Sequence, residues 1–368
     1  MKKIKLNKTE ENIALVQALA GKDKAKAYQA QLALAAFVGP LISEFSEKAR
    51  TLSNLFTTLT FDADDAPSVP VDLYYDITDE QEIMVWSQTT AGGLATNFLQ
   101  PVESEMKFHT NTLQSAWSFD NKHVRRNRMD VLGKSLTKIM QEIMIKQDRY
   151  SATLILNTLG DNHNGTSTSH VIDSVATGKM LPADLNALTT RAKRIRKSWN
   201  GGTPVGAEVG PTDLILSPER MADIRSMAFE PVNTKGANAT TGTAASGTVD
   251  APDSVREELW GGAGVASFWG LGLLELLELG PNEAYCNLYD TFAGGTFNAG
   301  DDLVVAVNQR SESLLRAVNT DAETYAEFTI SPDDQFTGRA KKTGFVGEVE
   351  EGRMVIDARD ILGIRIQA

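Results

Sequence analysis

The longest amphipathic segment of the chain, residues 127–159, constrains its fold most. Apolar residues recur there at Leu132, Leu136, Ile139 and Ile143, a 4-3-4 spacing that places them on one face of a helix. At 1.5 Å per residue, roughly 33 residues span about 50 Å. Because a small compact domain does not need a helix of that length, the segment predicts the spine of an extended scaffold.

Two segments of different character precede this helix. Residues 8–57 are rich in alanine and carry apolar residues at helical spacing, which predicts a helical N-terminal arm that docks on another surface. From residue 58 the chain becomes acidic and contains prolines, and strand-like runs follow at 71–75, 82–86 and 105–110. These runs predict a long two-stranded ribbon with a turn-rich tip between the last two. Because an isolated ribbon is only marginally stable in water, we expect it to lie on another surface.

The chain after the long helix mixes helices and strands. Residues 183–199 predict a second helix with an apolar stripe and five basic side chains, most of which lie off that stripe. Residues 212–216 predict a strand that leads directly into a helix, with Ser217 as the N-cap and Pro218 at the first helical position. Two further strand patterns are found at 303–307 and 361–366.

The net charge of −12 conceals blocks of alternating sign. Residues 1–50 carry nine Lys and Arg against five Asp and Glu, residues 51–120 one against eleven, residues 121–200 fourteen against six, and residues 201–368 twelve against 26. The overall negative charge argues against a general nucleic-acid binder, because its field repels phosphate. Blocks this long also allow one copy of the chain to attract a different segment of the next copy. The pattern therefore predicts self-association.

The sequence contains no complete catalytic or metal-binding pattern. Cys286 is the only cysteine, has no basic residue near it in the sequence, and is interpreted as a small buried hydrophobe. Asp161, His163 and His170 have metal-ligand chemistry but no regular spacing, so solvated loop residues are favoured. The glycine-rich run at 261–264 lacks the Lys and Ser or Thr of a phosphate-binding loop. We therefore expect neither an enzyme nor a cofactor or metal site.

The N-terminus and the apolar segments bear on the location of the protein. The basic start is followed by Glu10 and Glu11, and further charges interrupt the apolar run that a signal peptide needs. The longest apolar stretch, residues 30–43, is short and contains Gly39 and Pro40, which favours a docked helix over a membrane span. With a single cysteine the chain fits a reducing compartment. We predict a soluble, cytoplasmic protein without a membrane partner.

The order of these parts resembles the major capsid proteins of tailed bacteriophages, which have the Hong Kong 97-type capsid fold. The resemblance is carried by residues 130–134 and 140–148 on the predicted spine, by 214–218 at the strand-to-helix step, and by 344–347 and 352–356 near the C-terminus. It covers nearly the whole chain and consists of element order. It implies an α+β fold with an N-terminal arm, an extended β-ribbon loop, a peripheral domain with a long spine helix, and an axial domain.

The resemblance also implies domain boundaries and partners. The N-terminal arm would be 1–57, the extended loop 58–122, the peripheral domain 123–210 with 322–368, and the axial domain 211–321. The chain would assemble as hexamers and pentamers into an icosahedral shell in the host bacterial cytoplasm, enclose double-stranded DNA and become part of the virion capsid. Portal, scaffolding or decoration proteins are the further partners that such a shell implies.

The charge blocks and the resemblance together predict an inter-subunit contact. The acidic ribbon of one subunit would lie over the basic spine segment of an adjacent subunit, and apolar ribbon residues would supply most of the buried area. Exposed ion pairs contribute about 0.2–1 kcal/mol each, so they would set register more than total affinity. The predicted acidic residues are Asp62, Asp64, Asp76, Asp79, Glu80 and Glu82, the apolar ones Val85, Trp86 and Trp117, and the basic ones Arg125, Arg126, Arg128 and Lys134.

Two alternatives stay open at the level of the sequence. An encapsulin-type bacterial nanocompartment shares the fold and differs in its cargo, and no feature of the sequence excludes it. An enzyme of unrecognised type is the more distant alternative.

Overall fold

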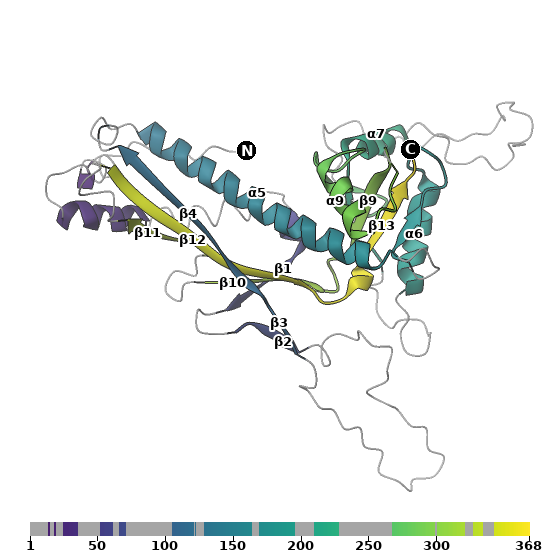
Figure 1. The fold of residues 1–368 in the computed structure, drawn as a ribbon, viewed down its shortest axis with the longest axis horizontal. Helices are drawn as coiled ribbons and strands as arrows, with labels where there is room; N and C mark the ends of the chain where they lie inside the picture. Colours follow the sequence, from purple (N-terminus) through teal and green to yellow (C-terminus); the bar gives the residue numbers. More distant parts are fainter. Residues whose placement is uncertain are drawn as a thin grey trace, which may run out of the picture. The chain divides into compact units, whose positions relative to one another are not determined.

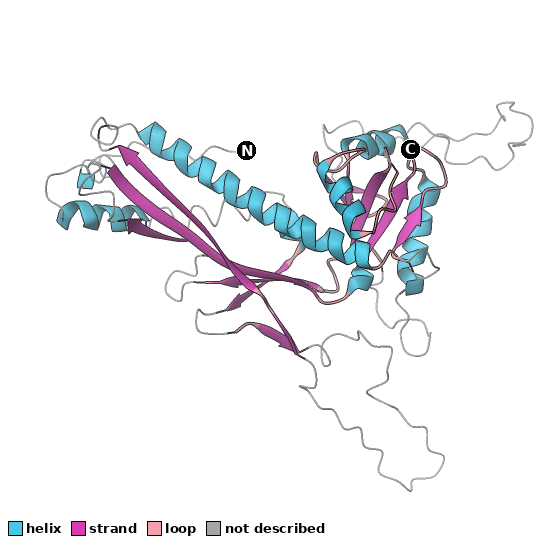
Figure 2. Cartoon of the chain, in the orientation of Figure 1, coloured by secondary structure: helices cyan, strands magenta, loops and turns pink. Residues whose placement is uncertain are grey.

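The structure of the chain is a computed structural model. It describes residues 14, 18–19, 25–35, 52–61, 66–70, 105–120, 122, 129–163, 169–195, 210–227, 267–298, 300–320, 327–333 and 342–368. Helices and strands are mixed along these residues, which confirms the predicted α+β class (Figure 2). The chain divides into two compact units, of which unit 1 consists of Met1–Val71, Val102–Ala152 and Leu314–Met354, and unit 2 of Asp72–Pro101, Thr153–Ser313 and Val355–Ala368.

Unit 1 is built from long strands and one long helix (Figure 1). Five of its strands form one sheet, in the order β1-β10-β12-β11 with β4 also paired to β12. β1 and β10 are parallel, whereas β2 and β3 form a separate antiparallel pair. The described elements are η1 (Leu52–Leu55), β1 (Thr57–Phe61), β2 (Ser68–Pro70), β3 (Glu105–Lys107), β4 (Thr110–Asp120), most of α5 (Met129–Asp161), β10 (Leu314–Asn319), β11 (Thr329–Asp333) and β12 (Lys342–Val355).

The longest strand pair of unit 1 joins β4 to β12 in an antiparallel ladder of eleven residue pairs. Trp117 and Phe119 of β4 both contact Phe345 of β12, with ring centroids 6.0 Å and 6.4 Å away. Gly347 of β12 lies against the rings of Phe328 and Trp117, so a Cβ at this position would collide with Phe328. Cross-strand aromatic pairs stabilise a sheet and fix its register. This aromatic layer therefore sets how β4 and β12 are aligned.

Unit 2 is a six-stranded mixed sheet with helices packed against it. Its central strand β9 is buried along its whole length, which indicates that both faces of the sheet are covered. Apolar residues of α6 and α7 share one core with β6, β8, β9 and β13. The strands are β5 (Val171–Asp173), β6 (Asp213–Leu216), β7 (Ser267–Phe268), β8 (Leu271–Glu275), β9 (Asp302–Val307) and β13 (Ile361–Ile366). Their order in the sheet is β5-β13-β9-β6-β8-β7. The helices are α6 (Pro182–Ile195), α7 (Pro218–Met227), α9 (Ala284–Phe292), η2 (Ala358–Asp360) and the end of α5.

The structure confirms the two strongest local predictions. The spine is a single helix of 33 residues, Met129–Asp161, which begins and ends two residues later than predicted. The strand-to-helix step is also present, because β6 ends at Leu216 and α7 begins at Pro218. The Ser217 hydroxyl accepts the backbone N–H of Arg220 at 3.3 Å, as expected of an N-cap.

Three elements differ from the sequence-based expectation. Residues 57–61 form β1, because they pair with the buried strand β10. The run at 105–110 is divided between β3 and β4 at Phe108, whose N–H donates to the Pro67 carbonyl at 3.0 Å. Helix α9 was not expected, and it forms because Tyr285, Cys286 and Tyr289 are spaced for burial on one face.

Several predictions concern residues that the structure does not describe. The predicted strands at 71–75 and 82–86 lie outside the described residues, and the described part of the N-terminal arm is helical at 25–35. None of the described helices is long and apolar enough to cross a membrane. The predicted boundaries of arm, loop, peripheral domain and axial domain stay a prediction.

Candidate functional site

One face of α5 is exposed and positively charged. Its exposed positions recur every three or four residues, as one face of a helix requires. Four of these side chains are basic and one is acidic. The face also carries the apolar Ile145 and the aromatic Tyr150, which are 43% and 36% exposed. At 1.5 Å per residue the surface is about 24 Å long. This α5 outer face consists of Lys134, Lys138, Glu142, Ile145, Lys146, Arg149 and Tyr150.

The opposite side of α5 is buried, and two of its buried residues are polar. Met144, Gln147 and Ser151 follow one another at helical spacing and are each at most 5% exposed. A buried amide or hydroxyl without a partner costs about 1–3 kcal/mol. Both polar side chains avoid this cost, because they bond to groups from other elements of unit 1.

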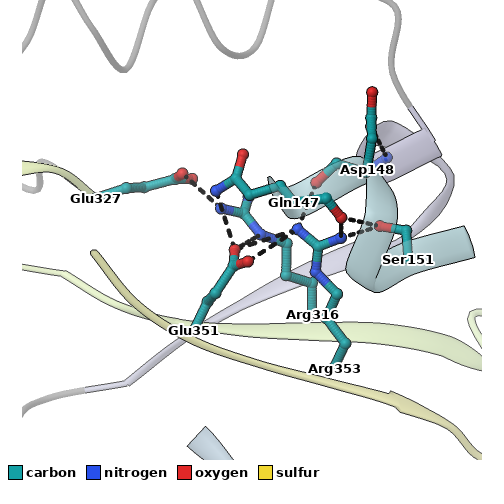
Figure 3. Close-up of polar contacts among 8 residues, drawn as sticks. Gln147, Asp148, Ser151, Arg316, Glu327, Glu351 and Arg353 are labelled. Carbon is teal, nitrogen blue, oxygen red and sulfur yellow. Dashed lines mark hydrogen bonds and ion pairs between the residues drawn. The ribbon is translucent and has the colours of Figure 1, made fainter. Parts of the chain in front are cut away.

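The partners of these residues are centred on Arg353 of β12 (Figure 3). Arg353 Nη1 donates to the Gln147 carbonyl at 2.6 Å and also to the Ser151 hydroxyl, and Nη2 donates to the Ser53 hydroxyl at 2.8 Å. The N–H of Ser53 in η1 in turn donates to the Asp148 carboxylate at 3.4 Å. One guanidinium therefore connects η1, α5 and β12, which are far apart in the sequence.

Glu351 compensates the charge of two buried arginines. Its Oε2 accepts from Arg316 Nε at 2.9 Å and from Gln147 Nε2 at 3.1 Å, and its Oε1 accepts from Arg353 Nη2 at 3.2 Å. Arg316 of β10 also contacts Glu327 at 3.2 Å. The side chains of Arg353 and Glu351 are 0% and 3% exposed. These charges are shielded from water and depend on one another, and we call the group of Ser53, Gln147, Ser151, Arg316, Glu327, Glu351 and Arg353 the Arg353 cluster.

The Arg353 cluster is also connected to the α5 outer face. Burial lowers the pKa of the Arg353 guanidinium, and the negative charge of Glu351 opposes this shift. The guanidinium lies 5.6 Å from the centre of the Phe56 ring and 5.9 Å from that of Tyr150, distances at which a cation attracts an aromatic face. Because Tyr150 belongs to the outer face, the cluster helps to fix the orientation of that face.

The two surfaces of α5 differ in the chemistry that they allow. Catalysis needs a nucleophile or a proton-transfer group that a substrate can reach, whereas Arg316, Glu351 and Arg353 of the cluster are buried and bonded to one another. The cluster is therefore structural. The outer face is accessible, positive and partly apolar, which is the composition that suits a negatively charged protein partner.

The structure describes two of the sequence-predicted contact residues. Lys134 is exposed on the α5 outer face, as the prediction requires of a contact residue. Trp117 is half-buried in β4 and stacks on Phe345 of its own chain, so it contributes to the sheet of unit 1, and its contact with a neighbour stays a prediction. The others lie outside the described residues: Asp62, Asp64, Asp76, Asp79, Glu80, Glu82, Val85, Trp86, Arg125, Arg126 and Arg128.

The residues singled out for metal or thiol chemistry have structural partners. The expectation of solvated loop residues is wrong for His170, which is buried, and Asp161 is the last residue of α5. His163 Nδ1 lies 2.8 Å from the Tyr289 hydroxyl, and His170 Nδ1 lies 3.1 Å from the Ile361 carbonyl. In the described part of the chain no group of three or more His, Cys, Asp or Glu could hold a metal ion. Cys286 is buried, as predicted, and burial raises the pKa of its thiol to about 11. The thiol is therefore protonated at neutral pH and a poor nucleophile.

The Arg353 cluster is not among the groups that the sequence predicts. The available signal was the presence of Gln147 and Ser151 on the side of α5 that also carries Met144. Polar residues on an apolar helix face indicate buried polar partners, but they do not identify them. Arg353 and Ser53 are 300 residues apart, so only the fold brings them together.

Comparisons with known proteins add a likeness in fold. No family model matches the sequence, and no curated protein does. Among solved structures, the capsid of the cyanophage P-SCSP1u is 14% identical with a TM-score of 0.48, and 85% of this chain and 86% of that chain are covered. The holo-SrpI encapsulin complex from Synechococcus elongatus PCC 7942 is 9% identical with a TM-score of 0.46, and 86% of each chain is covered.

A third similar structure is a virus-like particle from Pyrococcus furiosus. It is 12% identical with a TM-score of 0.43, and 90% of this chain and 99% of that chain are covered. The proteins with which the chain shares this likeness thus include phage capsids and encapsulins. At these identities and TM-scores the function of the chain has to be argued from its own elements and surfaces.

Proposed function

We propose that the chain is the repeating subunit of a closed protein shell, namely the major capsid protein of a tailed bacteriophage. The α5 outer face carries the proposal, because it is a positive, partly apolar surface whose orientation the Arg353 cluster fixes. A shell subunit has to offer such a surface to a neighbour. Residues 51–120 of another copy, with eleven acidic residues against one basic residue, have the complementary charge.

The expected contact is built from weak interactions that repeat around the shell. One exposed ion pair contributes about 0.2–1 kcal/mol, so four pairs on the outer face contribute on the order of 1–4 kcal/mol. Burial of Ile145 and Tyr150 against apolar ribbon residues such as Val85 and Trp86 adds about 25 cal/mol per Å². Because every subunit makes the same contact in a shell, modest contacts combine into a stable assembly.

The charge of the chain also suits a container for DNA. A strongly basic lining would bind phosphate tightly, whereas a net charge of −12 favours DNA that is held by enclosure. In this proposal hexamers and pentamers of the chain form an icosahedral shell around double-stranded DNA in the host cytoplasm. Portal, scaffolding or decoration proteins complete the virion.

Electron microscopy of the purified chain tests the proposal directly. Closed shells are expected, and particles from the native host should contain nuclease-protected double-stranded DNA. A protein cargo in place of DNA would support the encapsulin-type alternative. Discrete small oligomers without shells would contradict both and would favour an enzyme.

Charge reversal on the outer face tests the surface itself. The variant with Lys134→Glu, Lys138→Glu and Lys146→Glu should remain folded but fail to form shells, because the acidic ribbon would then be repelled. Lys179→Glu is the matched control, since Lys179 is exposed in unit 2 and away from α5 in the sequence. Normal shells from the triple variant would show that the outer face is not the contact.

A further inference from the structure

A turn in unit 2 presents an exposed leucine among carboxylates. Leu277, between β8 and α9, is 74% exposed, and Glu275, Glu278 and Glu283 around it are exposed as well. None of these carboxylates takes part in an ion pair within the described residues. We call Glu275, Leu277, Glu278 and Glu283 the acidic turn.

The backbone of the acidic turn is held by the body of unit 2. Leu279 next to it is 2% exposed and belongs to the core. The N–H of Leu276 donates to the Leu216 carbonyl at 2.9 Å, and the N–H of Tyr285 donates to the Glu278 carbonyl at 3.0 Å. A backbone that is already held loses less conformational entropy on association. Leu277 is therefore presented from a held backbone.

A surface of opposite charge lies at the end of α6. Lys193 and Arg194 in its last turn are exposed, and Arg191 one turn earlier is half-buried. Across the described chain no ion pair involves Lys193 or Arg194. We call Arg191, Lys193 and Arg194 the basic end of α6; it complements the acidic turn in charge.

The acidic turn and the basic end of α6 belong to different parts of the unit 2 sheet. α6 contacts β13, whereas the acidic turn follows β8, and β9 and β6 lie between these two strands. Three strand spacings of about 4.8 Å separate β13 from β8 by roughly 14 Å. Figure 1 shows α6 and α9 on opposite sides of β9 and β13. Complementary patches at different places on one subunit favour a head-to-tail contact between copies. Such contacts generate a ring when the rotations from each copy to the next add up to a full turn.

We propose that the acidic turn of one subunit docks on the basic end of α6 in the next copy of the chain, with Leu277 at the centre of the contact. The inference rests on the proposed function, in which copies of the chain surround a common axis, and it identifies the surfaces that they use. The contact lies within unit 2 and is separate from the α5 outer face of unit 1.

Reciprocal charge reversal tests this pairing in the full chain. One variant carries Glu275→Lys and Glu278→Lys, a second carries Lys193→Glu and Arg194→Glu, and a third carries all four changes. Sedimentation at low salt measures the subunit concentration at which assembly begins. We expect this concentration to rise at least about tenfold in each double variant and to return to within about threefold of the original in the fourfold variant, since opposite charges again face each other.

Two further measurements separate the possible failures. Leu277→Ser should also weaken assembly, but with little dependence on salt, because the lost interaction is apolar. Lys179→Glu is the control for a charge change elsewhere on unit 2 and should assemble normally. If the unmodified chain forms no multi-subunit particle, the proposed function and this contact both fail. If it assembles and the two double variants assemble equally well, only the contact of the acidic turn is overturned.

Discussion

Removing the one carboxylate that both buried arginines share should destabilise unit 1 severely. Glu351→Leu leaves Arg316 and Arg353 buried within the same cluster, with Glu327 as the remaining acidic partner of Arg316. The Glu327 side chain is 21% exposed and does not replace a carboxylate that is 3% exposed. A buried charge that loses its partner costs about 3–5 kcal/mol. Since the free energy of unfolding of a domain is about 5–15 kcal/mol, this cost is a large part of the stability of unit 1.

Urea unfolding of the unassembled subunit measures this effect. The midpoint should fall while the slope of the transition stays constant, because the change affects stability and not the surface exposed on unfolding. Glu348→Gln is the matched control, since Glu348 is exposed on the same strand. It should change the unfolding free energy by less than about 0.5 kcal/mol.

A double variant distinguishes charge burial from loss of packing. Glu351→Leu combined with Arg353→Met removes one charge of each sign, so the remaining Arg316 and Glu327 are again balanced. The double variant should therefore be more stable than the sum of the two single losses predicts, by about 2–3 kcal/mol. If the losses simply add, or if Glu351→Leu is no worse than Glu348→Gln, the reasoning about the Arg353 cluster is refuted.

Three further predictions concern unit 2. Trp269→Asn should raise the unfolding free energy by about 1 kcal/mol, because Trp269 has a φ of 58° beside Gly270 in a two-residue turn that Asn-Gly favours, and half of its surface is already exposed. Calorimetry measures the change, and a lower unfolding free energy would contradict the prediction. Cys286, with its thiol pKa of about 11, should react with a thiol reagent at pH 8 at least about a hundredfold more slowly in the folded chain than in urea, and equal rates would contradict its burial. Burial lowers the pKa of His163 and His170 in the folded chain below the ordinary 6.5. The stability that depends on their neutral forms is therefore complete above pH 6.5 and is lost as the pH falls through the pKa values of the folded chain. His170→Gln should reduce this loss of stability in acid unfolding curves, and an unchanged pH profile would refute the prediction.

The parts of the fold that the sequence predicts are those with a local physical cause. The spine helix is predictable because its apolar positions recur every three or four residues over more than thirty positions. The start of α7 is predictable because Ser217 and Pro218 have distinct requirements at a helix N-terminus. β1 is not predictable in the same way, because its conformation depends on pairing with β10, some 250 residues later in the chain.

The candidate site shows the same division between local and long-range causes. Helical spacing alone places Lys134 on the side of α5 away from the apolar stripe of Leu136, Ile139 and Ile143, and the charge blocks mark the region as basic. The partners of the buried side come from β10, β12 and η1. The residues that these elements contribute to the Arg353 cluster give no local signal in the sequence. A charge count by segment also does not separate Arg353, which is buried and paired, from Arg194, which is exposed.

The Arg353 cluster and the α5 outer face are best understood together. A buried group of charges is often no more stabilising than apolar residues of the same volume, so stability alone does not explain why two arginines and a glutamate lie under α5. Directional hydrogen bonds from Arg353 to Gln147, Ser151 and Ser53 permit fewer helix orientations than an apolar contact does. The proposed shell contact is made of weak pairs and needs that restriction, because each pair contributes about 0.2–1 kcal/mol and a helix free to rotate would lose several of them. We infer that the cluster serves the geometry of the outer face more than the stability of the subunit.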